Sequence, residues 1–125
     1  MRQIIFRGKR KDNGKWVYGF YALFASNKGL KHGIYTGAEN GCVIPYEVDP
    51  ETVGQFTGLC DKNGKKIFEG DIVKCLSLEY GYVNKEVYYS EDKGKFVLHS
   101  CGTDYEFDEY INVEVVGDIY DDKGF

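Results

Sequence analysis

Proline, histidine and long apolar segments are all scarce in this chain of 125 residues. It contains two prolines and two histidines, and no apolar run approaches the roughly 18 residues that a membrane-spanning helix requires. The opening segment, in which Ile4, Ile5 and Phe6 stand between two arginines, is too short for the apolar region of a signal peptide. We therefore expect a soluble protein that is not exported, contacts no membrane and works in the cytoplasm.

Motifs of known catalytic sites are also missing. The chain has no nucleophile elbow, zinc-protease helix, phosphate loop or dinucleotide fingerprint, and none of its serines has the sequence context of a nucleophile. The sequence therefore predicts no catalytic residue and no cofactor. An enzyme without a recognisable motif stays open as an alternative, and it would show a deep cleft lined by carboxylates with shifted pKa values.

The cysteines do not form a pattern that points to metal binding or disulfides. The four of them contain no Cys-x-x-Cys pair: Cys42, Cys60, Cys75 and Cys101. Thiols stay free in a reducing cytoplasm, and a zinc site would need scattered single ligands, including His32 and His99. Because free cysteine is among the most buried residue types, we expect four buried strand thiols and no metal site.

Charge is unevenly distributed along the chain. Residues 1–31 hold eight basic residues and one acidic residue, a net charge of +7, whereas the whole chain carries −4. The remainder therefore carries −11. Such a division indicates either a local patch that binds polyanions or complementary surfaces that meet when copies of the chain associate.

What the chain does have is glycine, with 16 residues, and aromatic side chains, at 16%. Strand-forming residues alternate with glycine-marked turns, which is typical of all-β domains. The strongest turn signal is Asn63-Gly64, which predicts a type I′ hairpin with Asp61 opposite Lys66 and Cys60 opposite Ile67. A second sharp corner is expected at Gly70, because glycine adopts backbone angles closed to other residues.

Further strands are expected between these turns. The pattern predicts one helical turn at Asp49–Thr52, only turn chemistry over most of 25–41, and strands at 3–7, 16–24, 71–78, 82–89, 95–100 and 113–120. The predicted fold is all-β with little helix: a single domain over residues 1–125, built as a coiled, partly closed antiparallel barrel of short strands and hairpins. An SH3-like element is expected around Glu69-Gly70-Asp71.

A family resemblance rests on the stretch around the central hairpin. Its motif is Thr57-Gly58-Leu59, Asp61-Lys62-Asn63-Gly64 and Ile67-Phe68-Glu69-Gly70-Asp71-Ile72-Val73. Together with Phe6-Arg7-Gly8-Lys9-Arg10, Trp16-Val17-Tyr18-Gly19 and Val115-Val116-Gly117-Asp118-Ile119-Tyr120, this motif resembles the signature of the YopX-like proteins of bacteriophages and prophages. The resemblance implies a small β-rich protein of unassigned biochemical role in a bacterial host.

The signature residues are interpreted as structural rather than functional. They are Thr57, Gly58, Asp61, Asn63, Gly64, Glu69, Gly70 and Asp71. The sequence departs from the family pattern at Cys60 and Phe68, where a polar residue and a tyrosine are common. Glu69 and Asp71 have the spacing of an acid–base or metal pair, but an aspartate after a turn glycine usually bonds nearby backbone N–H groups.

A second group of carboxylates alternates with aromatic residues near the end of the chain. Asp104, Glu106 and Asp108 would lie on one face of an extended strand, where calcium is the functional interpretation. The spacing of a calcium-binding loop is absent, so we favour a solvated strand face.

The aromatic run at residues 16–24 is the first candidate interaction surface. Trp16, Tyr18 and Phe20 lie on one face of the predicted strand, and Tyr21 lies on the other. A core of this size does not easily bury so many aromatic side chains, and exposed aromatic patches are found at interfaces. The leading hypothesis is a phage accessory protein that assembles with itself or binds a host or phage protein.

The alternative hypothesis is a nucleic-acid-binding β-barrel that uses the basic first hairpin. Its residues would be Arg7, Lys9, Arg10 and Lys11, because cations next to aromatic rings suit phosphates and stacked bases. The acidic balance of the whole chain argues against this interpretation.

Overall fold

The computed structural model describes residues 3–37 and 45–120, apart from the side chains of Glu109 and Ile111. The strands are β1 (Phe6–Lys9), β2 (Trp16–Ser26), β3 (Gly29–Tyr35), β4 (Pro45–Glu47), β5 (Gly54–Cys60), β6 (Lys66–Phe68), β7 (Asp71–Ser77), β8 (Gly81–Ser90), β9 (Lys95–Ser100), β10 (Thr103–Tyr105) and β11 (Ile111–Asp118). Two short 3₁₀ helices, η1 (Pro50–Thr52) and η2 (Phe107–Glu109), complete the described elements. No helix in these two ranges is long and apolar enough to cross a membrane.

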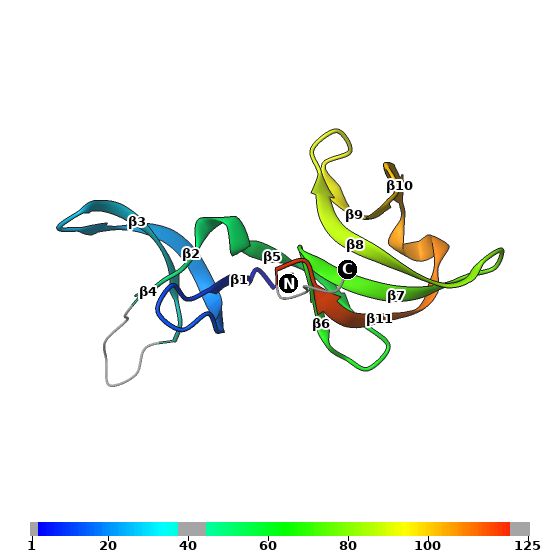
Figure 1. Cartoon of the computed structure of the whole chain (residues 1–125), viewed down its shortest axis with the longest axis horizontal. Helices are drawn as coiled ribbons and strands as arrows, with labels where there is room; N and C mark the ends of the chain where they lie inside the picture. Colours follow the sequence, from blue (N-terminus) through cyan, green and yellow to red (C-terminus); the bar gives the residue numbers. More distant parts are fainter. Residues whose placement is uncertain (1–2, 38–44, 121–125) are drawn as a thin grey trace. The chain divides into compact units, whose positions relative to one another are not determined.

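The strands form two antiparallel sheets, which confirms the predicted all-β class (Figure 1). One sheet has the order β4-β3-β2-β1-β5-β6 and the other the order β10-β9-β8-β7-β11. A barrel closes when its first and last strands pair, and β10 and β11 do not pair within the described residues. The barrel part of the prediction is therefore corrected: the strands divide between two sheets, and no closed barrel is found in the described part of the chain.

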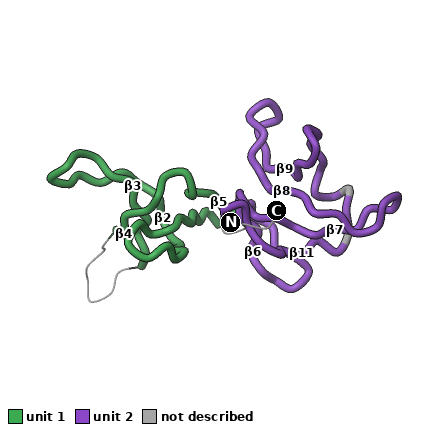
Figure 2. Tube along the Cα trace, viewed as in Figure 1, with its two compact units in different colours: residues 1–56 green, residues 57–125 purple. Residues whose placement is uncertain are grey.

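Residues group into two compact units, 1–56 and 57–125 (Figure 2). Strand β5 begins in the first unit and ends in the second. The expectation of one cooperative domain over residues 1–125 stays a prediction.

The first unit is built on the long hairpin of β2 and β3. Its buried apolar side chains among the described residues are Ile34, Val48 and Phe56. The sequence predicted little structure where β3 lies, because Gly29–Tyr35 lacks an alternating pattern. Strand β2 nevertheless pairs with it from Ser26 opposite Gly29 to Phe20 opposite Tyr35. The Phe24 ring packs over Gly33 and occupies the space that a side chain at this position would fill.

The second unit holds the larger core. Five side chains with at most 1% exposure pack together: Ile67, Val73, Cys75, Val87 and Leu98. Ile67 comes from β6, the last strand of the six-stranded sheet, and the other four come from β7, β8 and β9 of the five-stranded sheet, in which apolar residues alternate toward the core.

The cysteines differ from the expectation of four buried thiols. Cys75 is buried in the core, but Cys60 and Cys101 are exposed. Cys60 ends β5, and Cys101 lies in the turn between β9 and β10, so neither faces the core of a sheet. Cys42 lies outside the described residues.

The type I′ turn was predicted at the wrong place. Gly64 has φ +83°, but Asn63 does not have the positive φ that this turn requires, and the Asp61 N–H donates to the Lys65 carbonyl at 2.7 Å. Asp61 therefore pairs with Lys65 rather than Lys66, across a wider loop. Positive φ at two successive residues occurs instead at Cys101 (52°) and Gly102 (78°), which join β9 to β10.

Candidate functional site

Within the signature, Asp61 links the β5–β6 loop to strand β11. Its Oδ1 accepts hydrogen bonds from the backbone N–H groups of Asn63 and Lys65, both at 2.9 Å, and its Oδ2 accepts from the Val115 N–H at 3.0 Å. Burial raises the pKa of this carboxyl, but the three N–H donors outweigh burial and hold the pKa below its ordinary value. The arrangement satisfies backbone donors and leaves the carboxylate little capacity to bind a ligand.

The rest of the signature also bonds backbone groups. The Thr57 hydroxyl donates to the Ile67 carbonyl at 2.8 Å and accepts from the Leu59 N–H at 3.1 Å, next to Gly58 at φ +89°. At the second corner, Asp71 is 2% exposed and accepts from the Phe68 N–H at 2.8 Å. Half-buried Glu69 precedes Gly70 at this corner.

Tight packing restricts Gly70 itself. Its φ is +92°, and a Cβ added there would lie 2.8 Å from the Tyr120 ring. Its N–H donates to the Val87 carbonyl, and its carbonyl accepts from the Ile119 N–H. The corner thus joins β8 to the end of β11.

The aromatic residues of β2 lie on its two faces as the alternation predicts. Trp16, Tyr18 and Phe20 share one face, and Tyr18 and Phe20 are 49% and 70% exposed. Tyr21 lies on the other face, where its hydroxyl hydrogen-bonds His32 Nδ1 and its ring lies 6.0 Å from that of Phe6. Tyr21 therefore packs within the first unit, whereas Tyr18 and Phe20 on the other face are exposed.

Two of the four cations of the first hairpin lie on the face of Trp16, Tyr18 and Phe20: Lys9 is half-buried, and Arg7 is only 5% exposed. The Arg7 guanidinium is 4.2 Å from the centre of the Trp16 ring, and the Lys9 ammonium is 5.3 Å from it. The β1–β2 register places Arg7 opposite Tyr18 and Lys9 opposite Trp16. Cations and aromatic rings thus share one face of the sheet.

The other two cations are paired with carboxylates. Arg10 forms two hydrogen bonds to Asp12, at 2.9 and 2.5 Å, and this pairing lowers the pKa of Asp12. Lys11 lies 3.3 Å from Glu47. The structure therefore places Arg7 and Lys9 against Trp16 and pairs Arg10 and Lys11 with carboxylates, and the Arg10 guanidinium also lies 4.4 Å from the centre of the Tyr46 ring.

The three carboxylates that were expected on one solvated strand face do not share one strand. Strand β10 ends at Tyr105, so Asp104 and Asp108 lie on different elements, and Glu106 pairs with Lys95 at 2.6 Å. Asp104 accepts from the Tyr88 hydroxyl at 2.9 Å and lies 2.8 Å from His99 Nδ1. Hydrogen bonds from His99 and Tyr88 lower the pKa of Asp104. Over 3–37 and 45–120, no three His, Cys, Asp or Glu side chains gather to hold a metal ion.

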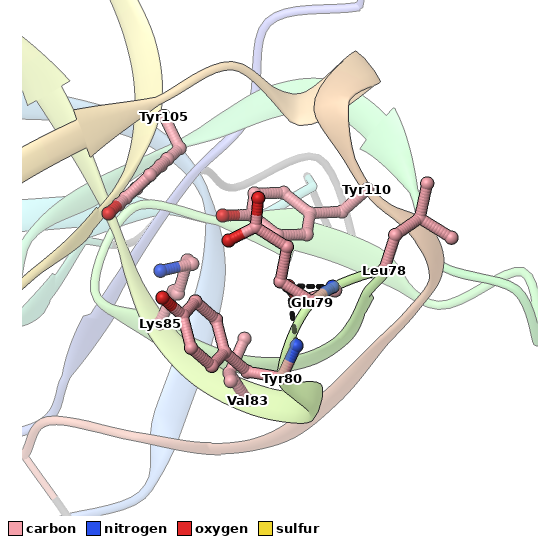
Figure 3. Close-up of a pocket in the computed structure, with 8 residues that line it drawn as sticks. Leu78, Glu79, Tyr80, Val83, Lys85, Tyr105 and Tyr110 are labelled. Atoms are coloured by element: carbon pink, nitrogen blue, oxygen red, sulfur yellow. Dashed lines mark hydrogen bonds between the residues drawn. The ribbon is translucent and has the colours of Figure 1, made fainter.

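A pocket of about 430 Å³ lies in the second unit beside the β7–β8 turn, and Figure 3 shows the residues that line it. Its walls are the β7–β8 turn at residues 77–80 together with Val83, Lys85, Tyr105 and Tyr110. The Ser77 hydroxyl accepts hydrogen bonds from the backbone N–H groups of Glu79 and Tyr80, both at 3.3 Å, which shape the turn.

Lys85 is the functional candidate that sequence reasoning missed. Its side chain is only 6% exposed, and its ammonium lies 3.8 Å from the centre of the Tyr105 ring and 5.4 Å from that of Tyr110. A signal was present: in β8 the alternation that turns Val83 and Val87 inward also turns Lys85 inward. A lysine at an inward position is rare unless it has a partner.

Comparison with known proteins gives the family and the fold. A family model described as YopX protein matches residues 5–124. No curated protein sequence matches this chain significantly. The crystal structure of protein EF1440 from Enterococcus faecalis has 20% sequence identity and a TM-score of 0.58, covering 95% of this chain and 94% of that one. At this identity the likeness concerns the fold alone.

Proposed function

This chain belongs to the YopX family, and from that premise we propose that it is a phage or prophage accessory protein that assembles with a second copy of itself in the host cytoplasm. The observation that carries the proposal is the aromatic face of β2, which consists of Trp16, Tyr18 and Phe20. Phe20 is 70% exposed although the strand is long and regular. Burying one such ring against a partner contributes about 1.5–3 kcal/mol.

The second copy is favoured as the partner because the two units have charges of opposite sign. Residues 1–56 hold eight basic and five acidic residues, a net charge of +3, whereas residues 57–125 hold eight basic and fifteen acidic residues, a net charge of −7. Each unit of one copy is therefore electrostatically complementary to the other unit of a neighbouring copy.

Sedimentation velocity over a range of protein concentrations tests the proposal. We expect the wild-type chain to associate reversibly and Phe20→Ser to weaken association at least tenfold. Leu30→Ser is the matched control, because Leu30 is also 70% exposed and lies opposite Ala25, on the Tyr21 side of the same hairpin. A wild-type chain that stays monomeric at all concentrations contradicts self-assembly, and capture of a phage or host protein that depends on Phe20 would then identify a different partner.

Binding of single-stranded nucleic acid is the second candidate function. Half-buried Lys9 and Arg7, which is only 5% exposed, lie over Trp16. Stacking on the exposed rings of Tyr18 and Phe20 would add about 1–3 kcal/mol per base. The pairing of Arg10 and Lys11 with Asp12 and Glu47 leaves fewer cations for phosphates than the sequence suggested. This function requires binding that weakens steeply as salt increases, and salt-independent absence of binding excludes it.

A further inference from the structure

Lys85 is a buried cation on the core side of β8. It lies opposite Val73 in the β7–β8 register, between Val83 and Val87 along its own strand. Taking an ammonium out of water costs several kcal/mol even after the protein relaxes. A cation in such a position therefore needs a compensating interaction.

The described residues supply only part of that compensation. The ammonium faces the rings of Tyr105 and Tyr110, and contacts of this kind contribute about 0.5–2 kcal/mol. No carboxylate of the described residues lies within ion-pair distance of it, whereas Lys62 and Lys95 of the same unit have Glu114 and Glu106 as partners. Among the described residues, Lys85 thus lacks an anion that would balance its charge.

The buried aspartates of the second unit make the contrast clear. Asp61, Asp71 and Asp118 each accept at least one backbone N–H bond at 3.0 Å or less. Their charges are satisfied within the fold. Lys85 is directed instead into the pocket of about 430 Å³, a volume typical of sites for small organic groups.

The other walls of the pocket define what can lie beside the cation. Tyr80, Tyr105 and Tyr110 present rings and hydroxyl groups, and Val83 is apolar (Figure 3). Such walls accept a planar or apolar body. Glu79 also lines the pocket and repels anions in proportion to their charge, so a single negative charge matches the site better than a phosphate dianion.

We propose that this pocket binds a monocarboxylate carried on an aromatic or apolar group, with Lys85 contacting the carboxylate and the tyrosine rings holding the attached group. The carboxylate can belong to a free organic acid or to the C-terminus of a polypeptide. Leu78, which is 95% exposed at the pocket mouth, offers an additional apolar contact to a longer ligand. The proposal concerns the second unit and does not depend on self-assembly through the aromatic face.

Isothermal titration calorimetry with the full chain tests the charge requirement. The probes are benzoate and its neutral analogue benzamide, and we expect benzoate to bind at least tenfold more tightly. Lys85→Met, which keeps the length of the side chain and removes its charge, should lose at least tenfold in benzoate affinity. The matched control is Lys74→Met, because the Lys74 ammonium also lies over a tyrosine ring, 4.7 Å from Tyr82, but Lys74 does not line the pocket.

Amide chemical shifts locate the binding and separate the two sources of carboxylate. Benzoate should shift the signals of Val83, Tyr105 and Tyr110 in the wild type and not in Lys85→Met. Acetyl-Gly-Gly-Phe and its C-terminal amide are the second pair of probes: tighter binding of the peptide acid than of benzoate indicates a polypeptide end, and equal binding indicates a free acid. The proposal is overturned if neither acid binds saturably, if benzamide binds as well as benzoate, or if folded Lys85→Met retains wild-type affinity.

Discussion

At the scale of single residues, carboxylates maintain the backbone of the second unit. Asp61 accepts from three backbone N–H groups, one of which belongs to Val115, 54 positions away in the chain. The hydrogen bond from Val115 attaches the β5–β6 loop to strand β11. A hydrogen bond to a charged acceptor contributes about 1.5–3 kcal/mol, and unsatisfied donors add to the loss when the acceptor is removed.

Replacing Asp61 by alanine should therefore lower the free energy of unfolding at pH 7 by about 2–3 kcal/mol. The pKa of Asp61 in the folded protein lies below the unfolded value of 3.8. The contribution of Asp61 to the free energy of unfolding is therefore complete above pH 3.8 and is lost as the pH falls through the folded pKa. Urea denaturation at pH 7 and at lower pH measures both effects. Asp92→Ala, in the exposed β8–β9 turn, is the control, and an Asp61→Ala variant within about 0.5 kcal/mol of the wild type would contradict this account.

At the scale of elements, loop length and turn type distinguish hairpins whose sequences look alike. Two loops, one between Arg10 and Lys15 and one between Ser90 and Lys95, each contain four residues. In the first loop the Gly14 N–H donates to the Arg10 carbonyl, and in the second the Gly94 N–H donates to the Ser90 carbonyl. The β5–β6 loop encloses three residues, because the Asp61 N–H bonds the Lys65 carbonyl. A common glycine-lysine pattern thus specifies a turn but not its length.

The backbone of the β9–β10 turn is strained at Cys101, and a substitution can relieve this strain. Cys101 has φ 52°, a conformation that costs most residues about 1–2 kcal/mol and that asparagine tolerates. Cys101→Asn should therefore raise the free energy of unfolding by about 0.5 kcal/mol, and Gly102→Ala should lower it by about 1 kcal/mol or more. Thermal denaturation of both variants tests this. Cys60→Asn, at an exposed position that ends a strand, should bring no gain, and an equal gain there would refute the turn explanation.

At the scale of the whole molecule, the two units differ in how much apolar surface they bury. Among the described residues, three apolar side chains are buried in the first unit and eight, counting Cys75, in the second. Each contributes about 1.5–3 kcal/mol on burial, so the second unit has the larger driving force for folding. The first unit instead exposes the aromatic face that we propose for self-assembly.

Native-state hydrogen exchange should report this difference. We expect the core amides of β7, β8 and β9 to exchange at least tenfold more slowly than those of β2 and β3, because stability follows local burial. The measurement is made at a concentration at which the chain is monomeric, since association would protect β2. Equal protection in both units would instead support one cooperative domain over residues 1–125.

Much of the strand pattern was predictable from local sequence. Strand β9 was predicted at its observed bounds, β7 and β8 were predicted to within one residue at each end, and η1 follows from Asp49 capping Pro50. Strands β3 and β4 were missed because they are short or glycine-rich and acquire their extended form by pairing with a neighbour. The extended strand expected through Asp104, Glu106 and Asp108 ends at Tyr105 as β10.

The sequence by itself determined the family, the all-β class and the positions of the corners, because alternation and glycine act within a few residues of the chain. The faces of β2 follow from the same short-range rule. Tertiary structure alone decided that the strands divide into two sheets, that Asp61 bonds β11, and that Lys85 opens into a pocket walled by Tyr105 and Tyr110. These features depend on contacts between residues far apart in the chain, for which no local pattern specifies the partner.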